Sequence, residues 1–211
     1  MFQKKMTQLP LMAVPAAISL FMTISPLQAE PSSLDYSFTF NMVVSAAGKV
    51  CAPNASARVT IIPAGQVEIM DVTVQGLPPN TGFDFFVLQV PKTPFGVAWY
   101  QGDIQTDKNG LGHAHFVGRF SIETFAFAQG SAPAPVVFNV DATLNPPFNP
   151  IQMYHLGLWF NSPQAASAAG CAATQTFFNG EHNAGIQVLN TSNFADGQGP
   201  LRNVNPSGIK P

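Results

Sequence analysis

Apolar and polar residues alternate along most of the chain between positions 34 and 190. A period of two places one set of side chains on one face of an extended strand and leaves the other face polar. In Leu34–Ser45 the apolar set is Leu34, Tyr36, Phe38, Phe40, Met42 and Val44. Similar patterns predict further strands at Ala57–Ile62, Gln66–Gln75, Gly82–Val90, Val97–Gln105, Leu111–Arg119, Ser121–Ala128, Val136–Val140, Ile151–Phe160 and Gly185–Leu189.

Turn residues separate these segments at near-regular intervals. Pro63-Ala64-Gly65 follows the second strand, and Asp107-Lys108-Asn109-Gly110 is typical of a hairpin turn, because Asn-Gly supplies the positive φ values that such turns need. Many short strands with turns between them indicate an all-β fold. We therefore expect a single β-sandwich or, alternatively, a barrel-like sandwich.

One short helix is expected near 162–170. Ser162 is a capping residue, Pro163 follows at the first helical position, alanines fill the interior and Gly170 ends the segment. After Asn190 large apolar residues become rare, which is typical of irregular structure. The predicted domain organisation is therefore a β-sandwich over 30–190 followed by an irregular C-terminal tail over 191–211.

The N-terminal residues 1–29 have the pattern of a secretory signal peptide. Lys4 and Lys5 precede the mainly apolar stretch Leu9–Ile24, and Leu27-Gln28-Ala29 offers apolar or small residues for cleavage after Ala29. A membrane anchor would need about twenty uninterrupted apolar residues, whereas two prolines interrupt this shorter run. We therefore expect a secreted, periplasmic or cell-surface protein with no membrane span after cleavage.

The two cysteines, Cys51 and Cys171, are predicted to form a disulfide, because an even pair in an oxidising compartment usually does. The chain-entropy model gives a bridge that spans so many residues roughly 4–5 kcal/mol of stability. Thiols used in catalysis or metal binding are the alternative, but neither cysteine belongs to a CxxC or Cys-His cluster.

Charged residues make up only 9% of the chain, with a formal net charge of −2, whereas about 25% charged residues are usual. Nothing in this composition provides the basic patch that a nucleic acid needs or a polybasic membrane segment. A surface with few charges also tolerates close packing against other molecules. These features agree with a protein that acts by surface contact.

Several sequence segments resemble known proteins. GLPPNTGFDFFV is similar to the turn that enters a core strand in fibronectin-like sandwich domains, with Phe83 at the usual aromatic position. PFGVAWYQGDIQTDKNGLGHAHF, HLGLWFNSP and FFNGEHNAGIQVLN resemble a family of uncharacterised secreted bacterial proteins, over most of Leu77–Asn190. This resemblance implies an exported all-β protein and brings no activity, cofactor or site residue with it.

Four histidines are the candidates for metal binding. His113 and His115 lie two apart on one predicted strand and so share a face, His155 lies on another strand, and His182 follows Glu181 in a turn. Histidines from neighbouring strands can bind Zn²⁺ or Cu²⁺. The alternation, however, also fits two exposed histidines with no ligand, and we expect no resident cofactor.

Other candidate sites are weaker. A glycosidase needs two acids across a cleft, and single acids such as Glu68, Asp71, Glu123 and Glu181 do not define such a pair. No catalytic motif is present, so no catalytic residue is predicted. Of the aromatic residues, Trp99 and Trp159 are expected in the core, and Tyr100 and Tyr154 are candidates for surface contacts.

The sequence therefore favours a non-catalytic, exported β-sandwich that binds a protein, a glycan, an envelope partner or copies of itself. The alternative hypothesis is a histidine-based Zn or Cu protein, either a carrier or an enzyme. These hypotheses differ in where they place His113, His115 and His155, together or apart.

Overall fold

The structure is a computed structural model that describes residues 36–126 and 150–206. The expected signal peptide and the expected strand Val136–Val140 lie outside the described residues. Within them, short helices occur at η2 (Gly48–Val50), α1 (Pro163–Ala168) and η4 (Pro200–Asn203). The strands are β1 (Phe38–Val44), β2 (Ser56–Ala64), β3 (Val67–Gln75), β4 (Gly82–Leu88), β5 (Ala98–Gln105), β6 (Gly112–Gly118), β7 (Phe125–Ala126), β8 (Ile151–Gln152), β9 (His155–Phe160) and β10 (Gln187–Asn190).

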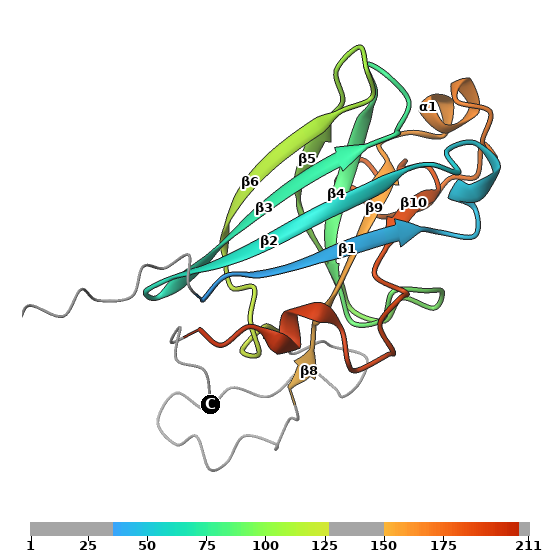
Figure 1. Ribbon diagram of the computed structural model, residues 1–211. Helices are drawn as coiled ribbons and strands as arrows, with labels where there is room; N and C mark the ends of the chain where they lie inside the picture. The colour runs from blue at the N-terminus through green and yellow to red at the C-terminus, as the bar shows by residue number, and fades with distance from the viewer. Residues whose placement is uncertain (1–35, 127–149, 207–211) are drawn as a thin grey trace, which may run out of the picture. The chain divides into compact units, whose positions relative to one another are not determined.

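Eight of these strands form one antiparallel sheet in the order β5-β4-β9-β10-β1-β2-β3-β6 (Figure 1). The two end strands, β5 and β6, are joined by the Asp107–Gly110 turn and lie near each other. At Gly102 of β5 a Cβ atom would come within 2.7 Å of the Phe116 ring of β6. The sheet is therefore nearly closed, and the all-β, barrel-like sandwich is confirmed.

Two halves of this sheet face each other across the main core. We call β1, β2, β3 and β6 sheet A and β5, β4, β9 and β10 sheet B; β1 pairs with both β2 and β10. The core contains Val59 and Val72 from sheet A and Phe83, Phe85 and Leu158 from sheet B, all at 0% exposure. A two-stranded sheet, β7 with β8, is separate.

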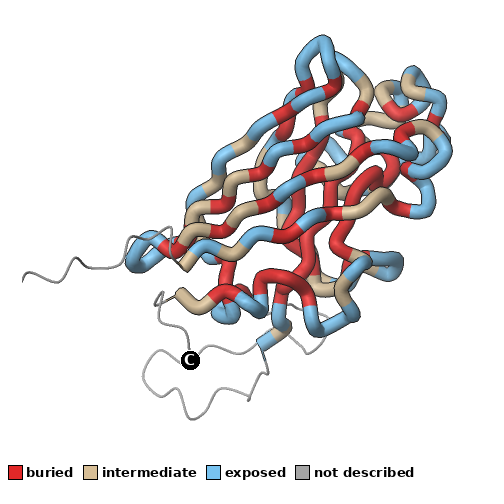
Figure 2. The backbone as a smooth tube through the Cα atoms, viewed as in Figure 1, coloured by how far each residue is buried: buried red, intermediate tan, exposed pale blue. Residues whose placement is uncertain are grey.

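The two halves differ in how their strands are buried. Strand β3 alternates between buried and more exposed residues, whereas all six residues of β9 are buried (Figure 2). The difference arises because the segments 89–97 and 171–186 cover the outer face of sheet B. Phe95 and Phe178 from these segments pack directly on Trp159 of β9.

Several strand boundaries differ from the expectation; within the predicted Ser121–Ala128, for example, only Phe125–Ala126 is a strand among the described residues. The predicted turn at Pro63 is part of β2, which continues to Ala64 and turns at Gly65. The pairing of β2 with β1 ends at Ile61. Pro63, which has no N–H, therefore does not have to donate a hydrogen bond to β1. The predicted strand Ile151–Phe160 is divided into β8 and β9, because Ile151 and Gln152 pair with β7, whereas the chain from His155 onward pairs with β4.

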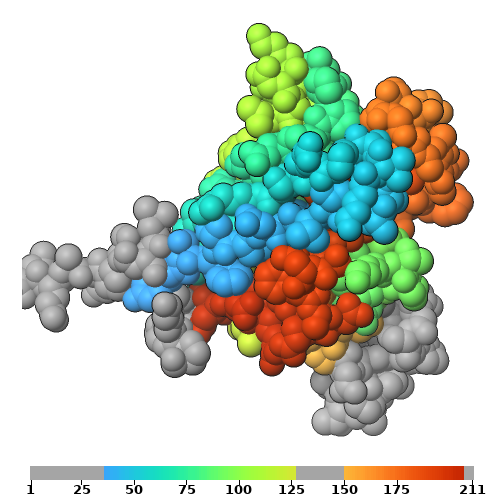
Figure 3. Space-filling view, turned by 45° about the vertical axis from the view of Figure 1, so that its right-hand side comes forward, coloured from blue at the N-terminus to red at the C-terminus, as the bar shows by residue number. Residues whose placement is uncertain are grey.

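The residues after Asn190 form no strand among those described, but they pack on the core. Leu201 of η4 has 0% and Val204 2% exposure, and the Phe194 ring meets Phe40 edge-on. The Asn193 side chain donates to the carbonyl of Asn41, so the C-terminal segment (red) lies against β1 (blue) in Figure 3. A few apolar residues thus anchor the C-terminal segment to the core, although its composition alone suggests that it does not pack.

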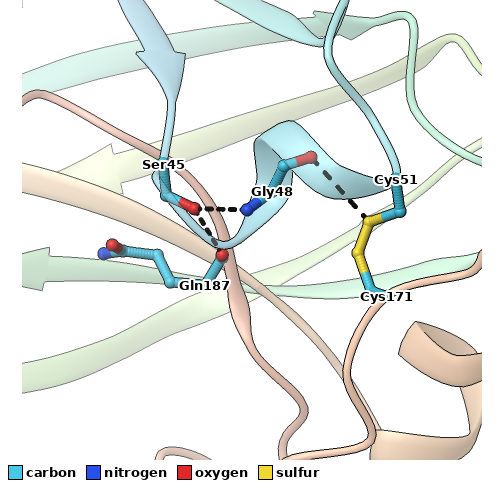
Figure 4. The surroundings of a disulfide bond; sticks show 5 residues. All are labelled: Ser45, Gly48, Cys51, Cys171 and Gln187. Atoms are coloured by element: carbon cyan, nitrogen blue, oxygen red, sulfur yellow. Dashed lines mark hydrogen bonds between the residues drawn. A yellow bond between two sulfur atoms is a disulfide. The ribbon is translucent and has the colours of Figure 1, made fainter.

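Helix α1 follows the expected capping pattern. The Ser162 hydroxyl accepts a bond from the Ala165 N–H, Pro163 occupies the first turn, and Gly170 has φ +82°. This arrangement presents Cys171 to Cys51, with 5.1 Å between the Cα atoms, and the two form the disulfide in Figure 4. Among the described residues no helix is both long and apolar enough to span a membrane.

The segment that leads to Cys51 is held in place by β10. The Ser45 hydroxyl donates to the carbonyl of Gln187 and accepts from the N–H of Gly48 (Figure 4). Gly48 must be small, because a Cβ atom would lie 2.6 Å from the Val188 carbonyl oxygen. The disulfide therefore links the end of β1 to the start of the segment that covers sheet B.

Candidate functional site

A β-bulge in β5 shapes the outer face of sheet B. Phe85 pairs with Gly102 but Phe86 pairs with Tyr100, so Gln101 is an extra residue. Without it, Tyr100 and Asp103 would point to opposite faces, because they are three positions apart. The bulge turns both to the outer face, a way in which bulges re-aim side chains near functional sites.

Asp103 lies directly opposite Asp84 of β4 in the strand register, so the two side chains are neighbours on one face of the sheet. Asp84 is 4% exposed, and its carboxylate accepts a bond of 3.2 Å from the Asn179 side chain. Burial, reinforced by the nearby charges of Asp103 and Glu181, raises the pKa of Asp84 to about 6. Asp84 therefore holds its proton at a higher pH than an isolated carboxyl group does.

Tyr100 completes this arrangement at the surface. Its side chain is 48% exposed, and its hydroxyl donates a 2.7 Å hydrogen bond to Asp103. Burial, followed by the bond to Asp103, raises the pKa of Tyr100 well above its ordinary value, so the hydroxyl stays a donor at neutral pH. The ring also meets Phe86 edge-on at 5.7 Å, which fixes its orientation.

The turn 179–183 supplies polar groups beside the pair. Asn179 accepts a bond from the N–H of Asn183, and the Asn183 amide donates to Glu181. His182 has φ +55°, so the chain reverses at this point. We call Asp84, Tyr100, Asp103, Asn179 and Glu181 the carboxylate–tyrosine site.

An aromatic cluster lies next to this site. Trp159 is the register partner of Asp84 on the neighbouring strand and is 0% exposed. Its ring stacks on Phe178 at 5.0 Å and meets Phe86 and Phe95 edge-on. The indole Nε1 has no hydrogen-bond partner in the described part of the chain. Trp159 is thus in a core, as expected, but in a second core outside sheet B.

The four histidines do not converge on one place. His113 and His115 are exposed on the outer face of sheet A, where His115 Nδ1 lies 2.7 Å and His113 Nε2 3.7 Å from the same oxygen of Asp71. His182 is exposed in the turn 179–183. In residues 36–126 and 150–206, no three His, Cys, Asp or Glu side chains are grouped so that they could hold a metal ion.

His155 and Tyr154 are buried. His155 has 0% exposure, its Nδ1 bonds to the Thr191 hydroxyl at 2.9 Å, and burial lowers its pKa. Tyr154, an expected surface residue, is 6% exposed, and its hydroxyl donates to the carbonyl of Ile122. The expectation of a surface position is therefore wrong. The C-terminal segment covers Tyr154, and the N–H of Leu201 in that segment donates to the Tyr154 carbonyl.

Other acids have structural roles. Buried Glu68 accepts a bond from the N–H of Phe120 and pairs with Arg119 at 3.7 Å. Asp107 accepts bonds from the N–H groups of Asn109 and Leu111, which lower its pKa and close the β5–β6 turn. The hairpin turn is therefore confirmed.

The acid pair that the fold brings together, Asp84 with Asp103, was not predicted. Two sequence clues exist: Asp84 interrupts the apolar run Gly82–Leu88, and Gly102, next to the bulged Gln101, interrupts a predicted strand, as glycines at bulges do. Chemically, the carboxylate–tyrosine site offers an aromatic ring, an amide and two exposed acids, Asp103 and Glu181, to a ligand, while Asp84 is buried beside them. The chain matches no family model, and no curated protein matches it either.

Proposed function

We propose that this protein is an exported, non-catalytic β-sandwich that binds glycans through the carboxylate–tyrosine site. One observation carries the proposal: a half-exposed Tyr100 ring is held by Asp103 beside the buried acid Asp84 and the amide of Asn179. The resemblance to secreted bacterial proteins and the signal-like N-terminus support export.

A glycan fits this chemistry. A flat aromatic ring with one polar end offers an apolar surface on which the C–H face of a sugar packs. Carboxylate oxygens accept hydrogen bonds from hydroxyl groups, and amides both donate and accept. The small proportion of charged residues, 9%, favours a neutral ligand over a strongly charged one.

The placement of the acids argues against glycoside hydrolysis. Retaining and inverting glycosidases set two carboxyl groups on either side of the scissile bond, about 5–5.5 Å and 6.5–9.5 Å apart, respectively. Here Asp84 and Asp103 are register partners on one face of the sheet, and Asp84 is only 4% exposed. A buried acid cannot reach a sugar at the surface, which supports a binding role over a hydrolytic one.

The test is calorimetric titration of the mature protein with neutral oligosaccharides selected on a glycan array. We expect saturable binding that Tyr100→Ala weakens at least tenfold and that Phe125→Ala, which removes another exposed aromatic ring, leaves unchanged. An array with no binding, or equal losses in both variants, would reject the glycan proposal.

Export has a separate test. We expect cleavage after Ala29, so that N-terminal sequencing of protein recovered from the medium or periplasm begins at Glu30. Recovery of the intact N-terminus in the membrane fraction would contradict export without bearing on glycan binding.

A further inference from the structure

A depression with a volume of about 380 Å³ lies beside the aromatic cluster, a size within the range of small-molecule sites. Residues of the covering segment 89–97 and of β9 and β10 line it, among them Lys92, Phe95, Trp159, Ile186, Gln187 and Asn190. None of these residues belongs to the carboxylate–tyrosine site.

The polar wall of the depression is already organised. The Asn190 amide donates to the Gln187 side chain at 2.8 Å, and the Gln187 amide donates to the carbonyl of Pro91 at 3.2 Å. These bonds tie the segment that carries Lys92 to β10. The wall therefore keeps its shape without a ligand.

Trp159 supplies part of the apolar wall. It lines the depression and is 0% exposed, and its Nε1 is buried without a hydrogen-bond partner among the described residues. Because that atom is inaccessible, a ligand in the depression would meet only the apolar part of the ring.

Lys92 adds a positive charge at the same place. It is exposed and forms no ion pair within the two described ranges. With Phe95, Trp159 and Ile186 around it, the depression combines one cation with a mainly apolar wall. This combination is complementary to a molecule that has a flat apolar body and an anionic group.

We propose that this depression binds a small organic anion with an aromatic body, such as an aryl carboxylate or sulfonate. The anionic group pairs with the Lys92 ammonium, and the ring packs against Phe95 and Ile186. The site is additional to the proposed glycan site and does not depend on it.

The test uses 8-anilinonaphthalene-1-sulfonate as the anionic probe and uncharged N-phenyl-1-naphthylamine as its matched control, each titrated into the folded mature protein. A Trp99→Phe background restricts tryptophan emission to Trp159. We expect one saturable site for the sulfonate, with energy transfer from Trp159. Lys92→Gln should weaken sulfonate binding at least fivefold and leave binding of the uncharged probe within twofold.

Two further variants complete the test. Phe95→Ala should weaken both probes, and Lys108→Gln, which removes a lysine of the β5–β6 turn, should weaken neither. Non-saturable binding, or equal effects of Lys92→Gln and Lys108→Gln, would overturn the proposal. A near-ultraviolet circular dichroism spectrum for each variant confirms that folded protein was compared. Competition by a neutral oligosaccharide should be absent, which separates this test from that of the glycan site.

Discussion

The outer face of sheet A is open, whereas that of sheet B is covered. On sheet A many outward side chains are polar and lie in solvent, as in the Asp71, His113 and His115 group and the Thr39–Thr60 hydroxyl pair. On sheet B the segments 89–97 and 171–186 bury Trp159 and Asp84. Both unassigned sites, the carboxylate–tyrosine site and the depression beside Trp159, lie on this covered side.

The comparison shows what a cover adds to a sheet. A side chain on an open face is surrounded by water, which screens its charge and satisfies its hydrogen bonds. Under a cover, water is excluded, so acids acquire shifted pKa values and donors depend on specific partners. Chemical specificity therefore develops on sheet B, although the strands of both halves obey the same backbone rules.

The largest expected effect comes from removing the aromatic side chain that the covering segments pack on. Trp159→Ala should lower the free energy of unfolding by about 3–5 kcal/mol, as for large aromatic residues in cores. Val117→Ala, on the open face at 59% exposure, should change it by less than about 0.5 kcal/mol. Chemical denaturation measures both, and similar losses would contradict the distinction between the two faces.

The disulfide tests how firmly the cover is attached. Cys51→Ser should lower the free energy of unfolding by about 2–5 kcal/mol, because the unfolded chain regains the freedom that the bridge removes. Since Cys171 starts the covering segment, hydrogen exchange should also accelerate in 172–183 more than in β2 and β3. Equal acceleration of hydrogen exchange in 172–183 and in β2 and β3 would show that the disulfide does not specifically attach the covering segment.

The buried acid on the covered side predicts a pH dependence of stability. The pKa of Asp84 rises from 3.8 to about 6 on folding, so the folded chain holds this proton between about pH 4 and 6, where the unfolded chain loses it. Its contribution is therefore full below about pH 4 and lost as the pH rises to 6, on the order of 2–3 kcal/mol at 1.36 kcal/mol per pKa unit.

Asp84→Asn should remove this dependence, because the amide stays neutral and can donate to Asp103. The difference in unfolding free energy between wild type and variant, measured from pH 4 to 7, isolates the effect. His155 changes stability in the opposite direction, since its lowered pKa makes stability fall as the pH drops below about 6.5. A difference that does not vary with pH would contradict the shift.

The smallest effect is expected on the open face. Replacing His113 and His115 together by Gln should change the unfolding free energy by less than about 0.5 kcal/mol in EDTA, because exposed pairs such as His115 with Asp71 contribute little. If added Zn²⁺ stabilises the wild type strongly and the double variant not at all, the metal hypothesis replaces this expectation.

Local patterns predicted most of the fold. The period-two segments gave the positions of β1 to β6, Ser162 and Pro163 marked the start of α1, and the turn at Asp107–Gly110 formed as expected. These features depend on neighbouring residues and on which side chains avoid water. For the same reason His113 and His115 could be assigned to one exposed face before the structure was known.

Only the tertiary structure decided what covers sheet B and therefore where the candidate sites lie. Asp84 meets Asp103 through a bulge at Gln101, and Asn179 reaches Asp84 from a segment 95 residues further along the chain. Tyr154 is buried and Tyr100 exposed, although both are aromatic residues on alternating segments. Such contacts join positions that are far apart in sequence, and their energy depends on water excluded by the whole fold, which no local pattern encodes.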